Sequence, residues 1–297
     1  MRRFVFQSVC FLIPVFLILV GVELSMRAIP NSYQLKDDWM RKNSHALSTL
    51  LLGNSHGYFA LSPSAMGDSV YNLCNVSQRI EQDYYLLCHY GETCPYLKRV
   101  ILVADNSNLF DGPMEVDEPA RVTYYQLYMG YRAHSMLSKY GFELSNMTYV
   151  FQKLKAYLQG DKWWCDSLGW GNGYLVEKRD SVSFFPENVR QHQFLNWDYT
   201  LRNRAYMDSI ALWCQQHEVE LVLLQTPVSE AYTCLTDPAQ LQLVNAMTDS
   251  CCMQYGAKKR DYSCDNRFRD TDFFDSDHLS DQGARKFSAI LARDLCR

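Results

Sequence analysis

A serine near the start of the chain and a histidine near its end form a candidate nucleophile and base. The apolar run at residues 50–52 breaks at Gly-Asn-Ser, which places Ser55 just after a buried strand. The segment Asp-Ser-Asp-His near the other end supplies His278, preceded by Asp275 and Asp277. A serine hydroxyl is a poor nucleophile until a base takes its proton. Serine, aspartate and histidine in this chain order suggest acyl transfer by a catalytic triad.

Two acids compete for the role of orienting the histidine. Asp275 lies three residues before His278, so its carboxylate can fold back onto one ring nitrogen and leave the other for Ser55. Asp277 is the second candidate, because it is adjacent to His278 and its side chain can face away from the ring. Both acids also suit a loop that only caps the next helix. His56 adjoins Ser55, but neighbouring side chains that leave a strand tend to point apart. His278 is therefore the better candidate base.

Short apolar runs alternate with longer helical stretches after residue 47. The expected strands are Leu47 to Leu52, Val70 to Leu73, Arg99 to Ala104 and Val219 to Gln225. The expected helices are Gln78 to Tyr90, Tyr124 to Lys139, Phe142 to Leu158, Trp197 to His217, Pro238 to Met253 and Ser280 to Leu295. This alternation predicts parallel strands with helices on both faces of the sheet. The carboxyl edge of such a sheet is where α/β proteins build their sites.

A long insertion, residues 111–196, separates the third and fourth expected strands. It is rich in Tyr, Trp and Phe and is expected to form helices and loops over the site. Trp163-Trp164 and the segment from Trp170 to Tyr174 have aromatic rings that can stack on sugars, although core packing is the favoured interpretation. The segment from Leu224 to Tyr232 follows the fourth strand and should lie at the same edge of the sheet.

Composition narrows the class of protein. A chain of 297 residues with 47% hydrophobic residues can form one large domain, here expected over residues 47–297. A net charge of −4 without a long basic run argues against nucleic acid as a partner. Eleven cysteines are present, without a recurring zinc-type pair, so neither a metal nor a cofactor is expected. Disulfides and reduced structural thiols both remain open.

The N-terminus is typical of a membrane anchor. Residues 4–23 are mostly apolar and follow two arginines, which matches the length needed to cross a bilayer. We expect an anchor at residues 1–26 and a polar stalk with a short helix at residues 27–46, with a cleaved signal peptide and a buried helix as alternatives. Basic residues flank the span on both sides, so the charge rule does not decide its orientation. A domain outside the membrane is the commoner arrangement for a single N-terminal span.

The paired motifs resemble those of the SGNH (GDSL-type) hydrolase superfamily, in particular its membrane-anchored members in bacterial cell envelopes. The family's Gly-Asp-Ser block matches Gly53-Asn54-Ser55, and its Asp-x-x-His block matches Asp275 to His278. The resemblance covers residues 48–297. It implies a three-layer α/β/α sandwich of flavodoxin type, with Ser55, His278 and Asp275 as the catalytic residues.

The family's two middle blocks match poorly. The second block supplies a glycine N–H to the oxyanion, and only a backbone donor near Cys74 can be carried over. The third supplies an asparagine side chain, for which Asn106 fits by position and Asn108 is the alternative. Together with the Ser55 N–H, these would form the oxyanion hole. Losing one such donor typically costs about 100- to 1,000-fold in rate.

The leading hypothesis from the sequence is a single-pass protein of the bacterial inner membrane with its domain on the periplasmic side. It would be a serine esterase or O-acyltransferase acting on acyl groups, acetyl above all, of envelope polysaccharides or on other esters. The alternative is a non-catalytic envelope protein of the same fold that binds a glycan or an assembly partner. A lipase acting on membrane lipid is a third possibility.

Overall fold

The computed structural model describes residues 1–134, 141–145, 147–160, 165–179, 181–191, 193 and 196–296. Within them, a five-stranded parallel sheet has the order β2-β1-β3-β4-β5. The strands are β1 (Thr49–Leu52), β2 (Val70–Asn72), β3 (Arg99–Val103), β4 (Glu220–Gln225) and β5 (Lys258–Asp261). This is the strand order of flavodoxin-like folds, and it confirms the predicted fold class.

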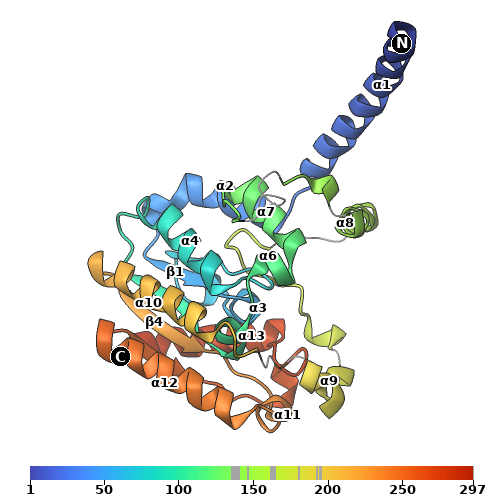
Figure 1. Ribbon diagram of the computed structural model, residues 1–297. Helices are drawn as coiled ribbons and strands as arrows, with labels where there is room; N and C mark the ends of the chain where they lie inside the picture. Colours follow the sequence, from blue (N-terminus) through green and yellow to red (C-terminus); the bar gives the residue numbers. More distant parts are fainter. Residues whose placement is uncertain are drawn as a thin grey trace.

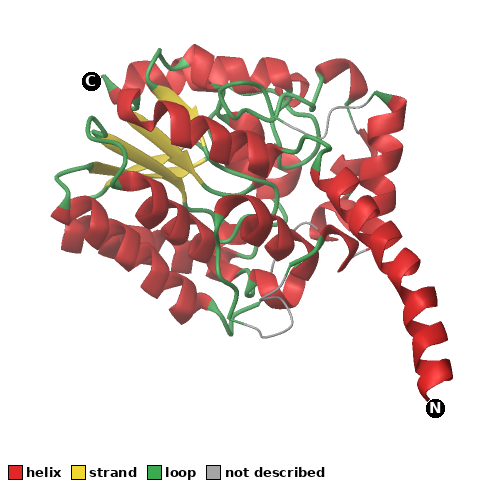
Figure 2. Ribbon diagram, turned by 90° about the horizontal axis from the view of Figure 1, so that it is seen from above, coloured by secondary structure: helices red, strands yellow, loops and turns green. Residues whose placement is uncertain are grey.

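Helices cover both faces of the sheet (Figure 1, Figure 2). Because successive side chains of a strand point to opposite faces, Leu50 and Leu52 enter one core and Leu51 enters the other. The first face is covered by α2 (Ser32–Asn43), α4 (Ile80–Gly91), α7 (Pro119–Met129), α10 (Thr200–Gln216) and α12 (Pro238–Tyr255). The second face is covered by α3 (Ser55–Ala60) and α13 (Asp281–Leu295). The remaining α-helices are α1 (Arg2–Arg27), α5 (Asn106–Phe110), α6 (Met114–Asp117), α8 (Met147–Gln159), α9 (Pro186–Gln191) and α11 (Glu230–Thr233).

The four expected strands are present, and β5 is an addition to them. Its sequence, Lys-Lys-Arg-Asp, lacks the apolar pattern by which a strand is recognised, because β5 lies at the sheet edge and its side chains are exposed or half-buried. The helix expected from Tyr124 to Lys139 ends at Met129, where Gly130 adopts a left-handed φ of 72°. The last part of that expected helix, residues 135–139, lies outside the described residues.

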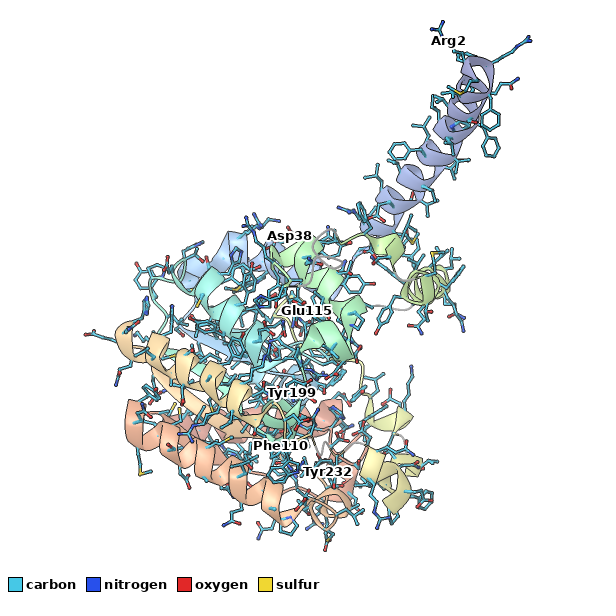
Figure 3. The ribbon with its side chains drawn as sticks, viewed as in Figure 1. Arg2, Asp38, Phe110, Glu115, Tyr199 and Tyr232 are labelled. Atoms are coloured by element: carbon cyan, nitrogen blue, oxygen red, sulfur yellow. The ribbon has the colours of Figure 1, made fainter. Side chains whose placement is uncertain are left out.

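Helix α1 projects away from the domain, with Arg2 at its far end (Figure 1, Figure 3). Its 26 residues include a window of mean hydropathy 2.6 that is not buried, so it is long and apolar enough to cross a bilayer. A signal sequence has the same properties. The C-terminal end of α1 is hydrogen-bonded to the insertion. The Glu23 carboxylate accepts from the backbone N–H groups of Glu143 (3.0 Å) and Leu144 (3.1 Å).

The segment expected to be a stalk packs onto the domain instead. Residues 27–46 contain α2, whose Tyr33 and Met40 belong to the larger hydrophobic core. Lys36 is fully buried and donates to the carbonyl oxygen of Cys74, in the loop after β2. Polar composition concealed this role, because only Tyr33, Trp39 and Met40 of α2 contribute to the core. The folded body therefore begins with α2 rather than near residue 47.

Candidate active site

Ser55 is placed by a tight turn at the carboxyl end of β1. Gly53 has a φ of +140°, and a Cβ at this position would lie 2.6 Å from the Cβ of Val103, so only glycine fits beside β3. Asn54 then caps α3, because its side chain accepts a hydrogen bond from the N–H of His56 (2.9 Å). Ser55 is the first residue of α3. It lies between β1 and β3, where the strand order of the sheet reverses. Ligands usually bind at this position in such folds.

The structure brings Ser55, His278 and Asp275 together in one chain of hydrogen bonds. His278 Nε2 lies 2.9 Å from Ser55 Oγ. On the other side of the ring, Nδ1 lies 2.9 Å and 3.0 Å from the two carboxylate oxygens of Asp275. Nδ1–H therefore donates to Asp275, which leaves Nε2 as an acceptor for the serine hydroxyl. This arrangement is able to remove the proton from Ser55.

The loop that carries the acid and the base is held from several sides. Asp275 Oδ1 also accepts the backbone N–H of His278 at 2.7 Å. The backbone N–H of Ser229 (3.0 Å) and its hydroxyl (2.6 Å) both donate to the carbonyl of Ser276. Ser280 caps α13 through the N–H of Gly283 at 3.2 Å. The segment after β4 thus lies at the site edge, as expected, and positions the loop through Ser229.

One aromatic ring of the insertion packs against His278. Tyr174 stacks between Phe59 (ring centroids 3.7 Å apart) and Phe274 (4.0 Å). Its ring also meets His278 edge to face, with centroids 5.5 Å apart. Trp170 is buried and donates to the carbonyl of Phe59 at 2.7 Å. This half of the aromatic segment therefore serves packing against α3, whereas Trp163-Trp164 lies outside the described residues.

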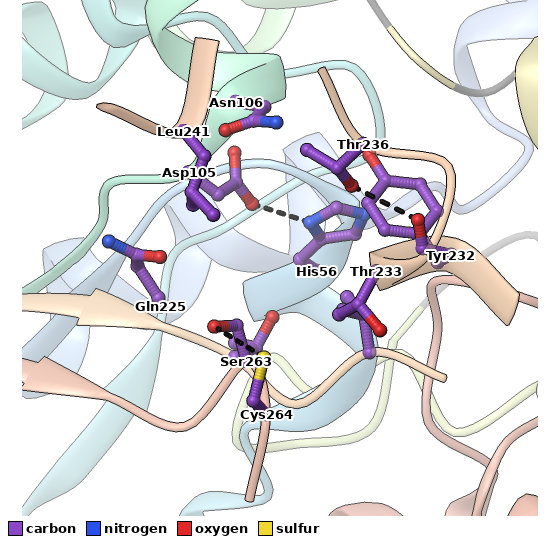
Figure 4. A pocket seen from close by; sticks show the side chains of 12 residues that line it. His56, Asp105, Asn106, Gln225, Tyr232, Thr233, Thr236, Leu241, Ser263 and Cys264 are labelled. Carbon is purple, nitrogen blue, oxygen red and sulfur yellow. Dashed lines mark hydrogen bonds and ion pairs between the residues drawn. The ribbon is translucent and has the colours of Figure 1, made fainter. Parts of the chain in front are cut away.

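A second histidine belongs to the same cluster. Adjacent side chains point apart on a strand, but α3 has already begun at Ser55. The His56 side chain therefore reaches the loops that carry Asp105 and Asp277. Its ring lies against His278, with centroids 4.8 Å apart. Nδ1 is 2.5 Å from Asp105 Oδ2, and Nε2 is 3.2 Å from Asp277 Oδ2 (Asp105 contact in Figure 4). Asp277 is buried at the site, where its carboxylate contacts His56 and accepts from the Ser276 hydroxyl at 3.1 Å.

The cluster also has the spacing of a metal site. Among the described residues, His56, Asp277 and His278 present ligand atoms within 4.8 Å of one another. In the structure these atoms already have hydrogen-bond partners, since His56 faces Asp277 and His278 faces Ser55. The arrangement is therefore complete as a hydrogen-bonding network.

Cys74 does not supply the oxyanion donor expected of it. Its backbone N–H donates to the side-chain oxygen of Asn72 at 3.0 Å. Its thiol fills the space beside Gly57, where a Cβ would lie 2.6 Å from the sulfur. Ser77, three residues further on, lines the cavity in front of Ser55 and has a left-handed φ of 56°. The loop expected to contribute is at the site, but through Ser77.

Asn106 is also displaced from its expected role. It lines a neighbouring cavity with His56, Asp105 and Leu241 (Figure 4), whereas the cavity that contains Ser55 is lined by Ser107 from the same turn. The alternative, Asn108, is buried and donates to the carbonyl of Val103 at 2.5 Å. Neither asparagine side chain therefore faces the Ser55 hydroxyl.

The cavity in front of Ser55 has a volume of about 230 Å³. Its walls combine the catalytic candidates with a buried ion pair between Arg79 and Asp111. Such a polar cavity suits a small polar group better than a long acyl chain.

The eleven cysteines are all unpaired thiols in this structure. Of the two expectations for them, disulfides and reduced thiols, the structure agrees with reduced thiols.

No protein-family model and no curated protein matches this chain. Among solved structures, the crystal structure of the lipase/acylhydrolase from Enterococcus faecalis is similar in fold. The match covers 84% of this chain and 95% of that one, with 11% sequence identity and a TM-score of 0.39. Function has to be inferred from the site itself at this level of likeness.

Proposed function

We propose that this protein is a membrane-anchored serine esterase or O-acyltransferase that acts on acyl groups, acetyl foremost, of cell-envelope glycans. The observation that carries the proposal is the 2.9 Å contact between His278 Nε2 and Ser55 Oγ, with Asp275 on the opposite ring nitrogen. The motifs shared with SGNH hydrolases support the same assignment of roles.

The proposed reaction proceeds in two acyl-transfer steps. Ser55 Oγ attacks the ester carbonyl while His278 Nε2 takes the hydroxyl proton, and Asp275 stabilises the imidazolium that forms. His278 then gives the proton to the leaving sugar oxygen, and Ser55 holds the acyl group. Water as the acceptor releases the free acid, whereas a sugar hydroxyl receives the acyl group and makes the protein a transferase.

The oxyanion hole in this proposal differs from the expected one. The N–H of Ser55 belongs to the first turn of α3, where amides have no carbonyl partner further back in the helix. Ser77 is the second candidate donor, through its backbone, because it lines the same cavity. With the N–H of Cys74 engaged and Asn106 in the next cavity, we expect slow turnover relative to an enzyme with three donors.

Location and substrate belong to the proposal as well. Helix α1 supports a single-pass anchor, and we assign the domain to the periplasmic side of a bacterial inner membrane. The polar cavity at Ser55 supports an ester with a small acyl group, such as that of an acylated polysaccharide, rather than a membrane lipid. The net charge of −4 supports the absence of a nucleic-acid partner.

One observation favours the second function, a non-catalytic glycan-binding or partner-binding protein. Two of the three expected oxyanion donors are engaged or turned away. Against it stands the short Ser55–His278 contact, because a site retained only for binding has no need of an activated serine.

The test is serine reactivity in the full chain held in detergent. Wild type is expected to hydrolyse p-nitrophenyl acetate faster than its octanoate analogue and to be labelled by a fluorophosphonate. Ser55→Ala should lose both, whereas Ser209→Ala, a matched change on α10 away from the site, should keep both. A wild type without turnover or labelling would overturn the catalytic proposal and favour the binding protein, while preference for the octanoate would favour a lipase.

A further inference from the structure

His56 has a carboxylate on each side of its ring. The ring is buried, with Nδ1 at 2.5 Å from Asp105 and Nε2 at 3.2 Å from Asp277. An ionised carboxylate can only accept hydrogen bonds, and a neutral imidazole carries one N–H. Both contacts are hydrogen bonds only if both ring nitrogens carry a proton. With both carboxylates ionised, the geometry therefore requires the imidazolium form.

We propose that His56 is a positioning residue that stays protonated, bridges Asp105 and Asp277, and so reserves His278 for Asp275 and Ser55. The inference rests on the proposed acyl-transfer function and extends it to the residue next to the nucleophile. His56 does not touch the reacting atoms in this scheme. It acts through Asp277 and His278.

The competition that His56 prevents is visible around His278. Asp277 Oδ1 lies 3.7 Å from His278 Nδ1, the same nitrogen that Asp275 binds at 2.9 Å. Two carboxylates thus approach one N–H. His56 binds the other oxygen of Asp277 and offsets part of its charge, while the Ser276 hydroxyl donates to Oδ1 at 3.1 Å. The Asp277 side chain is thereby held in place, and the ring of His278 keeps its alignment with Asp275.

His56 also joins the three chain segments that form the site. It is the second residue of α3, Asp105 caps α5 after β3, and Asp277 lies in the loop before α13. Asn54 adds a bond from the same turn, since its amide donates to Asp105 Oδ1 at 3.3 Å. One buried cation therefore links the serine, the neighbouring strand and the loop that carries the base.

Electrostatics agree with the hydrogen-bond argument. Burial alone would lower the pKa of His56, but the charges and hydrogen bonds of Asp105 and Asp277 outweigh it and raise that pKa well above its usual value. Burial would likewise raise the pKa of Asp105, yet its pairing with His56 lowers it. Other ionisable groups around His56 include His278, Tyr232 and Cys264 in one shared cavity, and Arg79 and Asp111 in the other.

A metal ion is the rival explanation for this cluster. His56 would then be neutral and direct a lone pair to the ion shared with Asp277 and His278. The two explanations predict opposite protonation states for His56 and opposite responses to a chelator. Both differences are measurable on the full chain in detergent.

The first experiment is a charge-rescue comparison of kcat. His56→Asn leaves Asp277 unbalanced and should lower kcat by about 100-fold through misplacement of His278, with little change in KM. Adding Asp277→Asn to this variant should restore most of the loss, because the competing charge is gone. His45→Asn, an exposed histidine before β1, is the matched control and should behave as wild type. An unchanged His56→Asn, or a double variant without recovery, would overturn the proposal.

The second experiment does not depend on turnover. In the nitrogen and carbon NMR spectra of histidine-labelled wild type at pH 8, one of the seven histidines should remain an imidazolium, and its signal should be absent from His56→Asn. A neutral His56 at pH 8, or activity that EDTA removes and zinc restores, contradicts the proposal. If wild type does not react with esters or phosphonate, the proposed function fails, while this spectrum still decides the state of His56.

Discussion

Ser55 and His278 are 223 residues apart in the chain, and their Oγ and Nε2 atoms lie 2.9 Å apart. Both residues are held in place by their local structure. Ser55 begins a capped helix after β1, and His278 follows a carboxylate that holds both its ring and its backbone N–H. Two groups fixed in this way would lose little entropy on reaching the geometry that the proposed reaction needs.

Replacing Asp275 by asparagine should remove most of the activity while the fold persists. An amide at this position can donate to Nδ1 and so favour the tautomer that carries its proton on Nε2, which cannot accept from Ser55. We expect kcat to fall by about 1,000- to 10,000-fold, as is typical of the orienting acid of a triad. The measurement is steady-state hydrolysis of an acetyl ester.

The matched control for this change is Asp270→Asn, on an exposed turn before the same loop. It should retain wild-type kcat. A loss of less than tenfold in Asp275→Asn would contradict the assignment of Asp275 and direct attention to Asp277, whose carboxylate lies 3.7 Å from the same nitrogen.

Gly53→Ala should destabilise the domain by about 3 kcal/mol, through backbone strain and overlap together. The φ of +140° strains any residue with a Cβ, and that Cβ would lie 2.6 Å from Val103. Gly67→Ala separates the two causes, because Gly67 has the same φ but no atom within 4 Å of a new Cβ. We expect thermal unfolding to show the larger loss at Gly53, partly restored by Val103→Ala. Equal losses at both glycines would mean that overlap with β3 is unimportant.

Buried Asp83 should make the protein less stable as the pH rises. Burial raises its pKa to about 7, although Gln78 donates to it at 2.6 Å. The folded state therefore holds a proton that the unfolded chain releases near pH 4, so the stabilisation is full below that pH and is lost as the pH rises through 7. The melting temperature of wild type should fall between pH 5 and 8.5, and Asp83→Asn should reduce that fall.

Asp68→Asn, at an exposed position, is the control for the pH series and should leave the slope unchanged. If Asp83→Asn melts with the same pH dependence as wild type, another group is responsible for it.

Local chemistry was sufficient to predict the sheet and the close approach of Ser55, Asp275 and His278. Apolar runs locate buried strands because parallel strands are covered on both faces. Ser55, Asp275 and His278 each lie in a short motif whose spacing has a direct physical meaning. The edge strand β5 has no such signal, since its four charged residues are not buried.

The oxyanion donors and His56 depend on contacts that spacing does not reveal. The N–H of Cys74 is not free, because it donates to the side-chain oxygen of Asn72. That contact depends on the rotamer of Asn72, which the sequence does not reveal. His56 binds partners 49 and 221 residues away, so no local pattern marks it. One signal was present in the sequence, because Asn54 is a good residue to cap a helix. If a helix begins at Ser55, the alternation of side chains along a strand no longer applies, and His56 is not expected to point away from the site.

Helix α1 should hold the protein in the membrane and remain part of the mature chain. Arginine at the centre of a membrane helix costs about 2.5–3.5 kcal/mol, so replacing both Val15 and Leu19 by arginine should move the protein out of the membrane fraction. Both side chains are exposed on α1, so isoleucine at the same positions is the matched control and should leave the protein resistant to alkaline extraction. Sequencing of the N-terminus should find residues 1–27 retained. A soluble chain that begins after residue 27 would instead identify α1 as a cleaved signal sequence.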